Sequence, residues 1–120
     1  MEFNIGMDGD LVTMDLNGDL VASSAEEFKS QVVKLRDKNF YFILLEMSRV
    51  GFMDSSGLGA CMAVHKMLNE KNGMVVLTKL SDSVVKVLRL TRADQKLKIA
   101  PTKQEGIKIL LDAIIAERKK

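Results

Sequence analysis

The chain has 120 residues, of which 47% are hydrophobic and 28% charged, and its formal net charge is +2. This length suits one domain with a hydrophobic core, and the balance of apolar and charged residues excludes a disordered chain. Basic residues are dispersed, aromatic residues make up only 5% and Trp is absent, so we expect no nucleic-acid partner. The single cysteine, Cys61, excludes an intramolecular disulfide and a cysteine-based metal site.

The N-terminal segment and the longest apolar runs bear on localisation. The first ten residues, MEFNIGMDGD, are acidic and interrupted by glycines, unlike a secretory signal. No apolar run approaches the roughly 20 residues that a membrane-spanning helix needs. We therefore expect a cytoplasmic protein without direct membrane contact.

Two alternating segments and a helix open the chain. Hydrophobic residues alternate over residues 3–7 and 12–16, on either side of an Asp-Gly-Asp turn. A period of two around Asp-Gly predicts a β-hairpin. Ser24, with Glu27 three residues later, matches a capping box, so a helix is predicted over residues 25–36.

The rest of the chain alternates between predicted strands and helices. Hydrophobic runs predict strands over 40–47, 74–80 and 97–100. Helical periodicity predicts helices over 57–71 and 103–117, and a short helix between them that is capped by Ser81. The helix over 57–71 carries one hydrophobic stripe, formed by Leu58, Cys61, Met62, His65 and Leu68. The pattern predicts a single α/β domain over residues 1–120. We expect a mixed, mostly parallel sheet with an N-terminal antiparallel hairpin, packed against about four helices.

The junction between the third predicted strand and its helix concentrates short polar and small residues over positions 54–59, Asp-Ser-Ser-Gly-Leu-Gly. A catalytic serine is disfavoured, because the only histidine, His65, lies ten residues beyond Ser55, about 15 Å along the helix. The pattern G-x-S-x-G also lacks its first glycine, since Met53 stands there. An anion site is weakly supported, because no lysine is placed to meet a phosphate and Asp54 would repel it.

Two interpretations of the serine pair remain open from local chemistry. One serine can be a helix N-cap, whose side-chain oxygen accepts a hydrogen bond from a free backbone N–H, and we expect Ser56 to play this part. A cap needs only one serine, however. Because loops at the carboxyl ends of strands in α/β domains are exposed and often functional, the other interpretation is a serine presented to a partner protein.

The segment FMDSSGLG, residues 52–59, resembles the signature of anti-sigma factor antagonists, the small STAS-domain proteins of bacterial partner-switching systems. The resemblance extends over nearly the whole chain. Residues 16–20 (LNGDL) and 24–28 (SAEEF) are similar to the family's G-E-L-D loop and first helix, and residues 80–91 (LSDSVVKVLRLT) to its third-helix segment. The resemblance implies a STAS fold with no catalytic or metal site, no cofactor, and a monomer when free.

In that family the first serine of the motif is phosphorylated, and the matching position here is Ser55. The resemblance implies that the kinase is a partner anti-sigma factor with serine kinase activity. The unphosphorylated form would bind and sequester this partner, and a metal-dependent serine phosphatase would restore that form. A phosphate at a helix N-terminus is tolerated by the helix dipole. We therefore expect the modification to switch binding and to leave folding intact.

The resemblance also places the partner-binding surface around Ser55. Its expected members are Asp54, Ser56, Gly57, Gly59, Asp19, Val21 and Phe52. The two glycines of the junction would let the partner approach the backbone closely. We assign Met53 and Leu58 to the core, and leave Phe52 open between core and interface.

Two positions depart from the family pattern. The loop that corresponds to G-E-L-D reads Gly-Asp-Leu-Val over residues 18–21, so that Val21 replaces its second carboxylate. Arg92 follows Thr91 at a position where relatives have a small residue, often glycine. These departures leave open a partner switch that acts on a target other than a sigma factor. A further alternative keeps the fold but predicts a structural or ligand-binding subunit of a membrane transport assembly.

Overall fold

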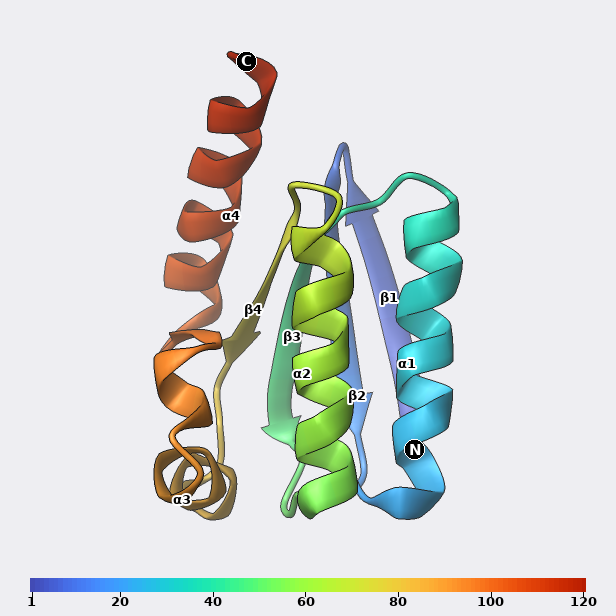
Figure 1. The fold of residues 1–120 in the computed structure, drawn as a ribbon, viewed down its shortest axis with the longest axis vertical. Helices are drawn as coiled ribbons and strands as arrows, with labels where there is room; N and C mark the ends of the chain where they lie inside the picture. Colours follow the sequence, from blue (N-terminus) through green and yellow to red (C-terminus); the bar gives the residue numbers. More distant parts are fainter.

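The computed structural model describes residues 1–120 as one five-stranded sheet flanked by helices (Figure 1). The strands follow the order β1-β2-β3-β4-β5 across the sheet. They are β1 (Glu2–Asp8), β2 (Leu11–Asn17), β3 (Phe42–Arg49), β4 (Met74–Thr78) and β5 (Lys98–Ala100). The helices are α1 (Ala22–Asp37), α2 (Ser55–Asn69), α3 (Asp82–Leu90) and α4 (Lys103–Arg118), with a short 3-10 turn η1 (Ala93–Gln95).

The pairing of the strands confirms the predicted mixed sheet. β1 and β2 are antiparallel and meet at a tight turn, where Asp8 pairs with Leu11. Gly9 takes a φ of 62° in this turn, a left-handed conformation that glycine adopts without steric cost. β2 to β5 are parallel and are joined by helical crossovers. The chain is a single α/β domain, as its pattern of elements predicts.

Helices cover both faces of the sheet, which explains why β3 reads as a continuous apolar run. α1 and α2 lie side by side across one face (Figure 1), where Ile43 and Leu45 join the larger hydrophobic core. Leu44 points to the opposite face, where α4 packs Leu110 and Ile114 against it. Because alternate residues of β3 are buried on opposite sides, no polar alternation is left in its sequence.

The start of α1 differs from the prediction. The helix begins at Ala22 with Val21 in the N-cap position, so Ser24 is not its cap. Ser24 lies within the first turn, where its Oγ accepts a hydrogen bond from the N–H of Val21 at 3.0 Å and donates one to the carbonyl of Asp19 at 2.8 Å. A serine at this position can reach back to the preceding loop, and here it closes the turn from the inside.

The buried face of α2 is rotated relative to the predicted stripe. Its buried residues are Gly57, Ala60, Cys61, Val64 and Leu68. Leu58, Met62 and His65 are only half-buried. The predicted stripe shares Cys61 and Leu68 with the buried face but omits Gly57, Ala60 and Val64.

The helices and the titratable side chains can be compared with the requirements of a membrane span and of a metal site. None of the helices combines the length and the apolar character needed to cross a membrane. The fold brings together no group of three or more His, Cys, Asp or Glu side chains that could hold a metal ion.

Candidate functional site

The serine junction is held against the loop that follows β2. The N–H of Leu20 donates to the carbonyl of Phe52 at 3.0 Å, and the N–H of Asp54 donates to the carbonyl of Leu20 at 3.3 Å. The N–H of Gly18 donates to the carbonyl of Arg49 at 3.2 Å. These bonds continue the parallel pairing of β2 and β3 beyond the strands, through a bridge between Leu20 and Met53. The two loops therefore form one surface at the carboxyl ends of β2 and β3.

Asp54 caps α2 and also binds the first turn of α1. Its Oδ1 accepts a hydrogen bond from the N–H of Gly57 at 2.9 Å, and its Oδ2 accepts one from the N–H of Ala22 at 3.3 Å. The prediction that Ser56 is the cap is therefore wrong. A carboxylate has two oxygens, so one side chain satisfies free N–H groups of two helices at once. The N-termini of α1 and α2 meet at this point (Figure 1).

Ser55 and Ser56 occupy the first two positions of α2, and both are exposed. Because Asp54 supplies the cap, neither hydroxyl is needed to satisfy the helix. The Oγ of Ser55 makes no hydrogen bond within the protein. The helix thus begins two residues earlier than the predicted range of 57–71, so that Ser55 lies in its first turn with an exposed hydroxyl.

The two glycines of the junction have different surroundings. Gly57 is buried, and a Cβ placed on it would lie 2.8 Å from the carbonyl carbon of Leu20 and closer still to the carbonyl oxygen. Its missing side chain thus allows the two loops to touch, and burial keeps it from a partner, contrary to the expectation. Gly59 is exposed, and a Cβ there would have no neighbour within 4 Å. Of the two, only Gly59 presents bare backbone to the outside.

Hydrophobic residues around the serines divide between core and surface. Met53 is buried, with 1% of its surface exposed, which confirms its assignment to the core. Leu58 is half-buried and packs against the same core. Phe52 is 48% exposed, an unusual fraction for a phenylalanine. The side chain of Phe52 is therefore available at the surface beside Ser55.

The loop between β2 and α1 adds the remaining predicted residues. Asp19 is exposed, and its Oδ1 lies 3.6 Å from where a Cβ on Gly51 would stand, so it borders the serine junction. Val21 is half-buried and is the N-cap residue of α1. The fold thus brings Asp19 and Val21 together with Phe52 and Ser55. We call this combined surface, residues 19–21 and 52–59, the serine surface.

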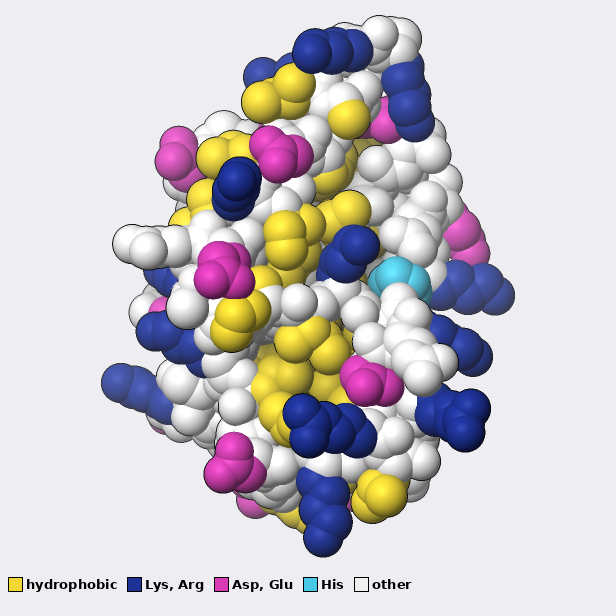
Figure 2. Space-filling view, turned by 90° about the vertical axis from the view of Figure 1, so that its left-hand side faces the viewer, with side chains coloured by type: hydrophobic (Ala, Val, Ile, Leu, Met, Phe, Trp, Pro, Cys, Tyr) yellow, Lys and Arg dark blue, Asp and Glu magenta, His cyan; other side chains and the backbone are white.

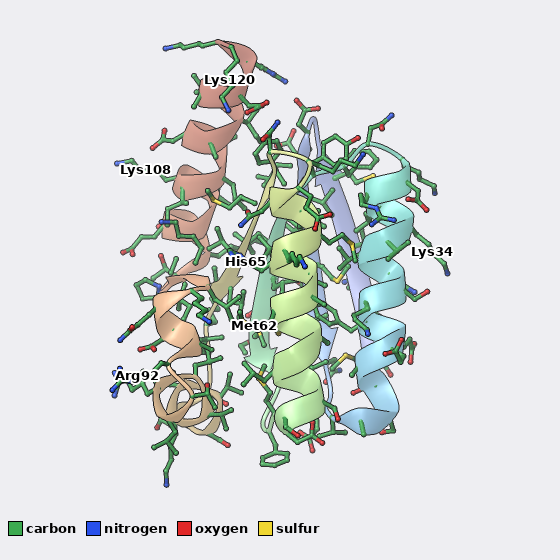
Figure 3. All side chains as sticks on the ribbon, viewed as in Figure 1. Lys34, Met62, His65, Arg92, Lys108 and Lys120 are labelled. Atoms are coloured by element: carbon green, nitrogen blue, oxygen red, sulfur yellow. The ribbon has the colours of Figure 1, made fainter.

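The two other nucleophile or base candidates lie outside the serine surface. His65 is on the middle of α2 (Figure 3), and its Nε2 lies 3.1 Å from the side-chain nitrogen of Asn69. Cys61 is buried, and desolvation raises the pKa of its thiol to about 12. The thiol stays protonated at neutral pH and is a weak nucleophile. Neither side chain can activate Ser55.

Three residues contribute to the serine surface in ways that the sequence analysis missed. Leu20 supplies backbone groups to both loops, Ser24 closes the start of α1, and Asp54 joins two helices. The position of Ser24 has no clear local signal, because the N-cap residue, Val21, is not one that usually caps helices. The pairing of Asp54 with Ala22 has no local signal, since 32 residues separate them.

The chain is similar in sequence and in fold to known proteins. A family model described as the STAS domain matches residues 3–106. A candidate anti-sigma factor antagonist of Thermotoga maritima is 30% identical over 99 residues, which cover 82% of this chain and 88% of the relative. A crystal structure of such an antagonist from the same organism has a TM-score of 0.85 at 28% identity and covers 90% of this chain and 93% of that one.

A further relative and a further solved structure extend the comparison. The anti-sigma-B factor antagonist of Listeria monocytogenes is 26% identical over 84 residues, 70% of this chain and 74% of the relative. The Bacillus cell fate determinant SpoIIAA, in its phosphorylated form, shares the fold with a TM-score of 0.69 at 24% identity, covering 89% of this chain and 97% of SpoIIAA. Since the family model spans most of its length, the chain belongs to the STAS domain family, and it is similar to members that are named anti-sigma factor antagonists.

Proposed function

We propose that this chain is a phosphorylation-controlled anti-sigma factor antagonist of a bacterial partner-switching system, acting in the cytoplasm. The observation that carries the proposal is the free hydroxyl of Ser55, exposed at the first turn of α2 and relieved of capping by Asp54. The names of the relatives support an anti-sigma factor as the partner. The phosphorylated form of SpoIIAA, a protein of the same fold, supports control by phosphorylation.

In this proposal the unmodified serine surface binds an anti-sigma factor that is also a serine kinase. The exposed side chains of Asp19, Phe52 and Ser56 would contact the partner, together with the half-buried Val21 and the bare backbone at Gly59. Transfer of a phosphoryl group to Ser55 adds a charge of about −1.5 to −2 beside the carboxylate of Asp54. A partner docked over this point would have to desolvate both negative groups, and it is released. A metal-dependent serine phosphatase returns the chain to its binding form.

The fold can accept the phosphate because of where Ser55 lies. The N-termini of α1 and α2 converge on Asp54, and each carries the partial positive charge of a helix dipole. The added oxygens meet free N–H groups at the start of α2. In this proposal the helix end stabilises the phosphate, so the modification changes binding and leaves the fold intact.

Incubation with a candidate kinase and MgATP, followed by intact-mass measurement, tests the proposal. The unaltered chain and the Ser56→Ala variant are expected to gain one phosphoryl group, and Ser55→Ala is expected to gain none. Ser83 provides an internal control, because like Ser56 it is an exposed serine at the second position of a helix. Labelling that persists in Ser55→Ala, or that maps to Ser83, would overturn the assignment.

A further inference from the structure

A hollow lies beside the serine surface, where α3 faces the ends of β4 and β5. Its volume is about 400 Å³, within the range of about 300–1,000 Å³ typical of small-molecule sites. Leu88 and Ala100 are buried at its base, and Leu80, Val85 and Ile99 form its half-buried sides. None of these residues belongs to the serine surface. The hollow is therefore a separate feature of the domain.

The position of the hollow is the one at which α/β domains commonly bind ligands. Lys79 directly follows the last residue of β4, and Pro101 directly follows β5. Both strands are parallel to β3, so the hollow opens at the carboxyl ends of the parallel strands. Loops at this edge form the crevices in which open α/β sheets hold small molecules.

The mouth of the hollow carries an excess of positive charge. Lys79 and Arg89 line it together with a single carboxylate, Asp94, and all three are exposed. None of the ion pairs of the protein includes either cation. Figure 2 shows the corresponding face, with hydrophobic side chains exposed at its centre and Lys and Arg side chains beside them. An anionic head group would find two unpaired cations next to an apolar surface.

We propose that this hollow binds a small amphipathic anion, a carboxylate with a short hydrocarbon tail. The tail would replace water against Leu80, Val85 and Ile99, and the carboxylate would meet Lys79 and Arg89 at the mouth. A single negative charge matches the net charge of the lining side chains, two cations against one carboxylate. No aromatic residue lines the hollow, so it offers no surface on which a nucleotide base could stack.

Methyl NMR of the full chain, titrated with octanoate, 1-octanol and acetate, separates the contributions of tail and head group. Octanoate is expected to shift the methyl signals of Val85, Leu88 and Ile99 saturably, with an affinity at least tenfold higher than those of the other two. Equal affinity for octanol would overturn the anionic class. Octanoate shifts confined to the exposed Leu111 and Ile115 of α4, or no saturable shift at all, would overturn the site.

Two substitutions by glycine test whether Lys79 at the mouth of the hollow contacts the carboxylate. Both replace a cationic residue that has a left-handed backbone conformation, so their backbone effects are comparable. Lys79 and Arg92 are both cationic and both left-handed, with φ of 56° and 59°, so glycine fits either position without strain. Arg92 does not line the hollow and extends away from the body of the protein (Figure 3). Lys79→Gly is expected to weaken octanoate binding about three- to fivefold, the effect of one exposed ion pair, and Arg92→Gly to leave it unchanged. Equal effects would overturn the assigned contact.

Filling the hollow provides a second, independent variant. Val85→Trp places a large side chain over the half-buried wall of the hollow on α3. It is expected to weaken octanoate binding more than tenfold, while the dispersion of the NMR spectrum reports that the fold is intact. Unchanged binding to a folded Val85→Trp variant would overturn the proposal, and Lys79→Gly decides the question if Val85→Trp does not fold.

Discussion

The N-termini of α2 and α3 carry nearly the same residues in a different order, yet only one of them forms the serine surface. Residues 54–56 read Asp-Ser-Ser, and residues 81–83 read Ser-Asp-Ser. At α3 the cap is Ser81, whose side chain accepts one hydrogen bond, from the N–H of Val84 at 3.3 Å. At α2 the cap is Asp54, which accepts one from its own helix and one from α1.

The order of the residues decides what is left exposed. At α3 the hydroxyl of Ser81 accepts the capping hydrogen bond itself, and this cap makes no link to a second helix. A carboxylate cap joins α2 to α1 and leaves Ser55 and Ser56 unused. The α2 terminus is thus a fixed platform that presents free hydroxyl groups. The two termini thus differ in support: the first turn of α2 is bonded to a second helix through Asp54, whereas the Ser81 side chain caps only its own helix.

The largest expected effect is on binding, from Ser55→Asp. The carboxylate would lie in the partner interface without a matching cation, which costs about 2–5 kcal/mol, some 30-fold to several thousand-fold in affinity. Stability is expected to stay nearly unchanged. A carboxylate in a first turn gains about 0.3–1 kcal/mol from the helix dipole, and this gain offsets its repulsion by Asp54. α3 already holds Asp82 at the equivalent position.

Titration calorimetry and a melting curve on one sample measure both halves of this prediction. The matched control is Ser83→Asp, which places the same charge in the first turn of α3 and is expected to leave partner binding unchanged. Binding of Ser55→Asp within threefold of the unaltered chain would show that the switch is not electrostatic at this residue. A loss of folding would place Ser55 in the packing of α2 instead.

The next effect is on stability, from alanine at the buried glycine of the junction. Gly57→Ala is expected to lower the free energy of unfolding by about 3 kcal/mol, since the new methyl group meets the backbone of Leu20, which cannot turn aside. Gly59→Ala is the control on the same helix. It has open space around it, and it is expected to raise stability by about 0.5–1 kcal/mol through helix propensity.

Urea unfolding of the two glycine variants tests this contrast. Equal effects would mean that the close contact between Leu20 and α2 is not maintained in solution. The contact of the two loops, and with it the common surface of residues 19–21 and 52–59, would then lose its physical basis.

Removal of the α2 cap is expected to have a smaller effect. Asp54→Ala removes two hydrogen bonds at helix N-termini and is expected to cost about 1–3 kcal/mol. Asp54→Asn keeps one acceptor oxygen for Gly57 and loses the other, so its cost is expected to be about half. Hydrogen exchange at the amides of Gly57 and Ala22 distinguishes the two bonds. An Ala22 amide that is equally protected in both variants and the unaltered chain would rule out the link between α1 and α2.

The sequence predicts the order of elements better than it predicts the contacts between their ends. The hairpin, the parallel crossovers and the Ser81 cap each depend on residues within a few positions, and the structure confirms them. The roles of Asp54 and Gly57 depend on Ala22 and Leu20, which are more than 30 positions away. Local preference favoured serine as the cap of α2, but the neighbouring helix offers a second donor that only a carboxylate can satisfy.

The exposure of Ser55 was predictable from the sequence, whereas the reason for this exposure was not. Ser55 follows a buried strand, and the carboxyl ends of such strands are exposed in α/β domains. Capping preference assigned the N-cap of α2 to Ser56, whereas in the fold Asp54 is the N-cap. The buried face of α2 shows a related error, because Gly57 and Ala60 contribute contact through small size and not through hydrophobicity.

The smallest expected effect separates the two serine roles most directly. Ser56→Ala is expected to change the free energy of unfolding by less than about 0.5 kcal/mol, since the side chain is exposed and caps nothing. Ser81→Ala removes the only side-chain cap of α3 and is expected to cost about 0.5–2 kcal/mol. Both variants make the same chemical change in a first turn or its cap, so the difference between them measures capping alone. Paired urea unfolding curves provide that difference. A cost for Ser56→Ala that equals the cost for Ser81→Ala would return the capping role to Ser56, and Asp54 would then be free to face the partner.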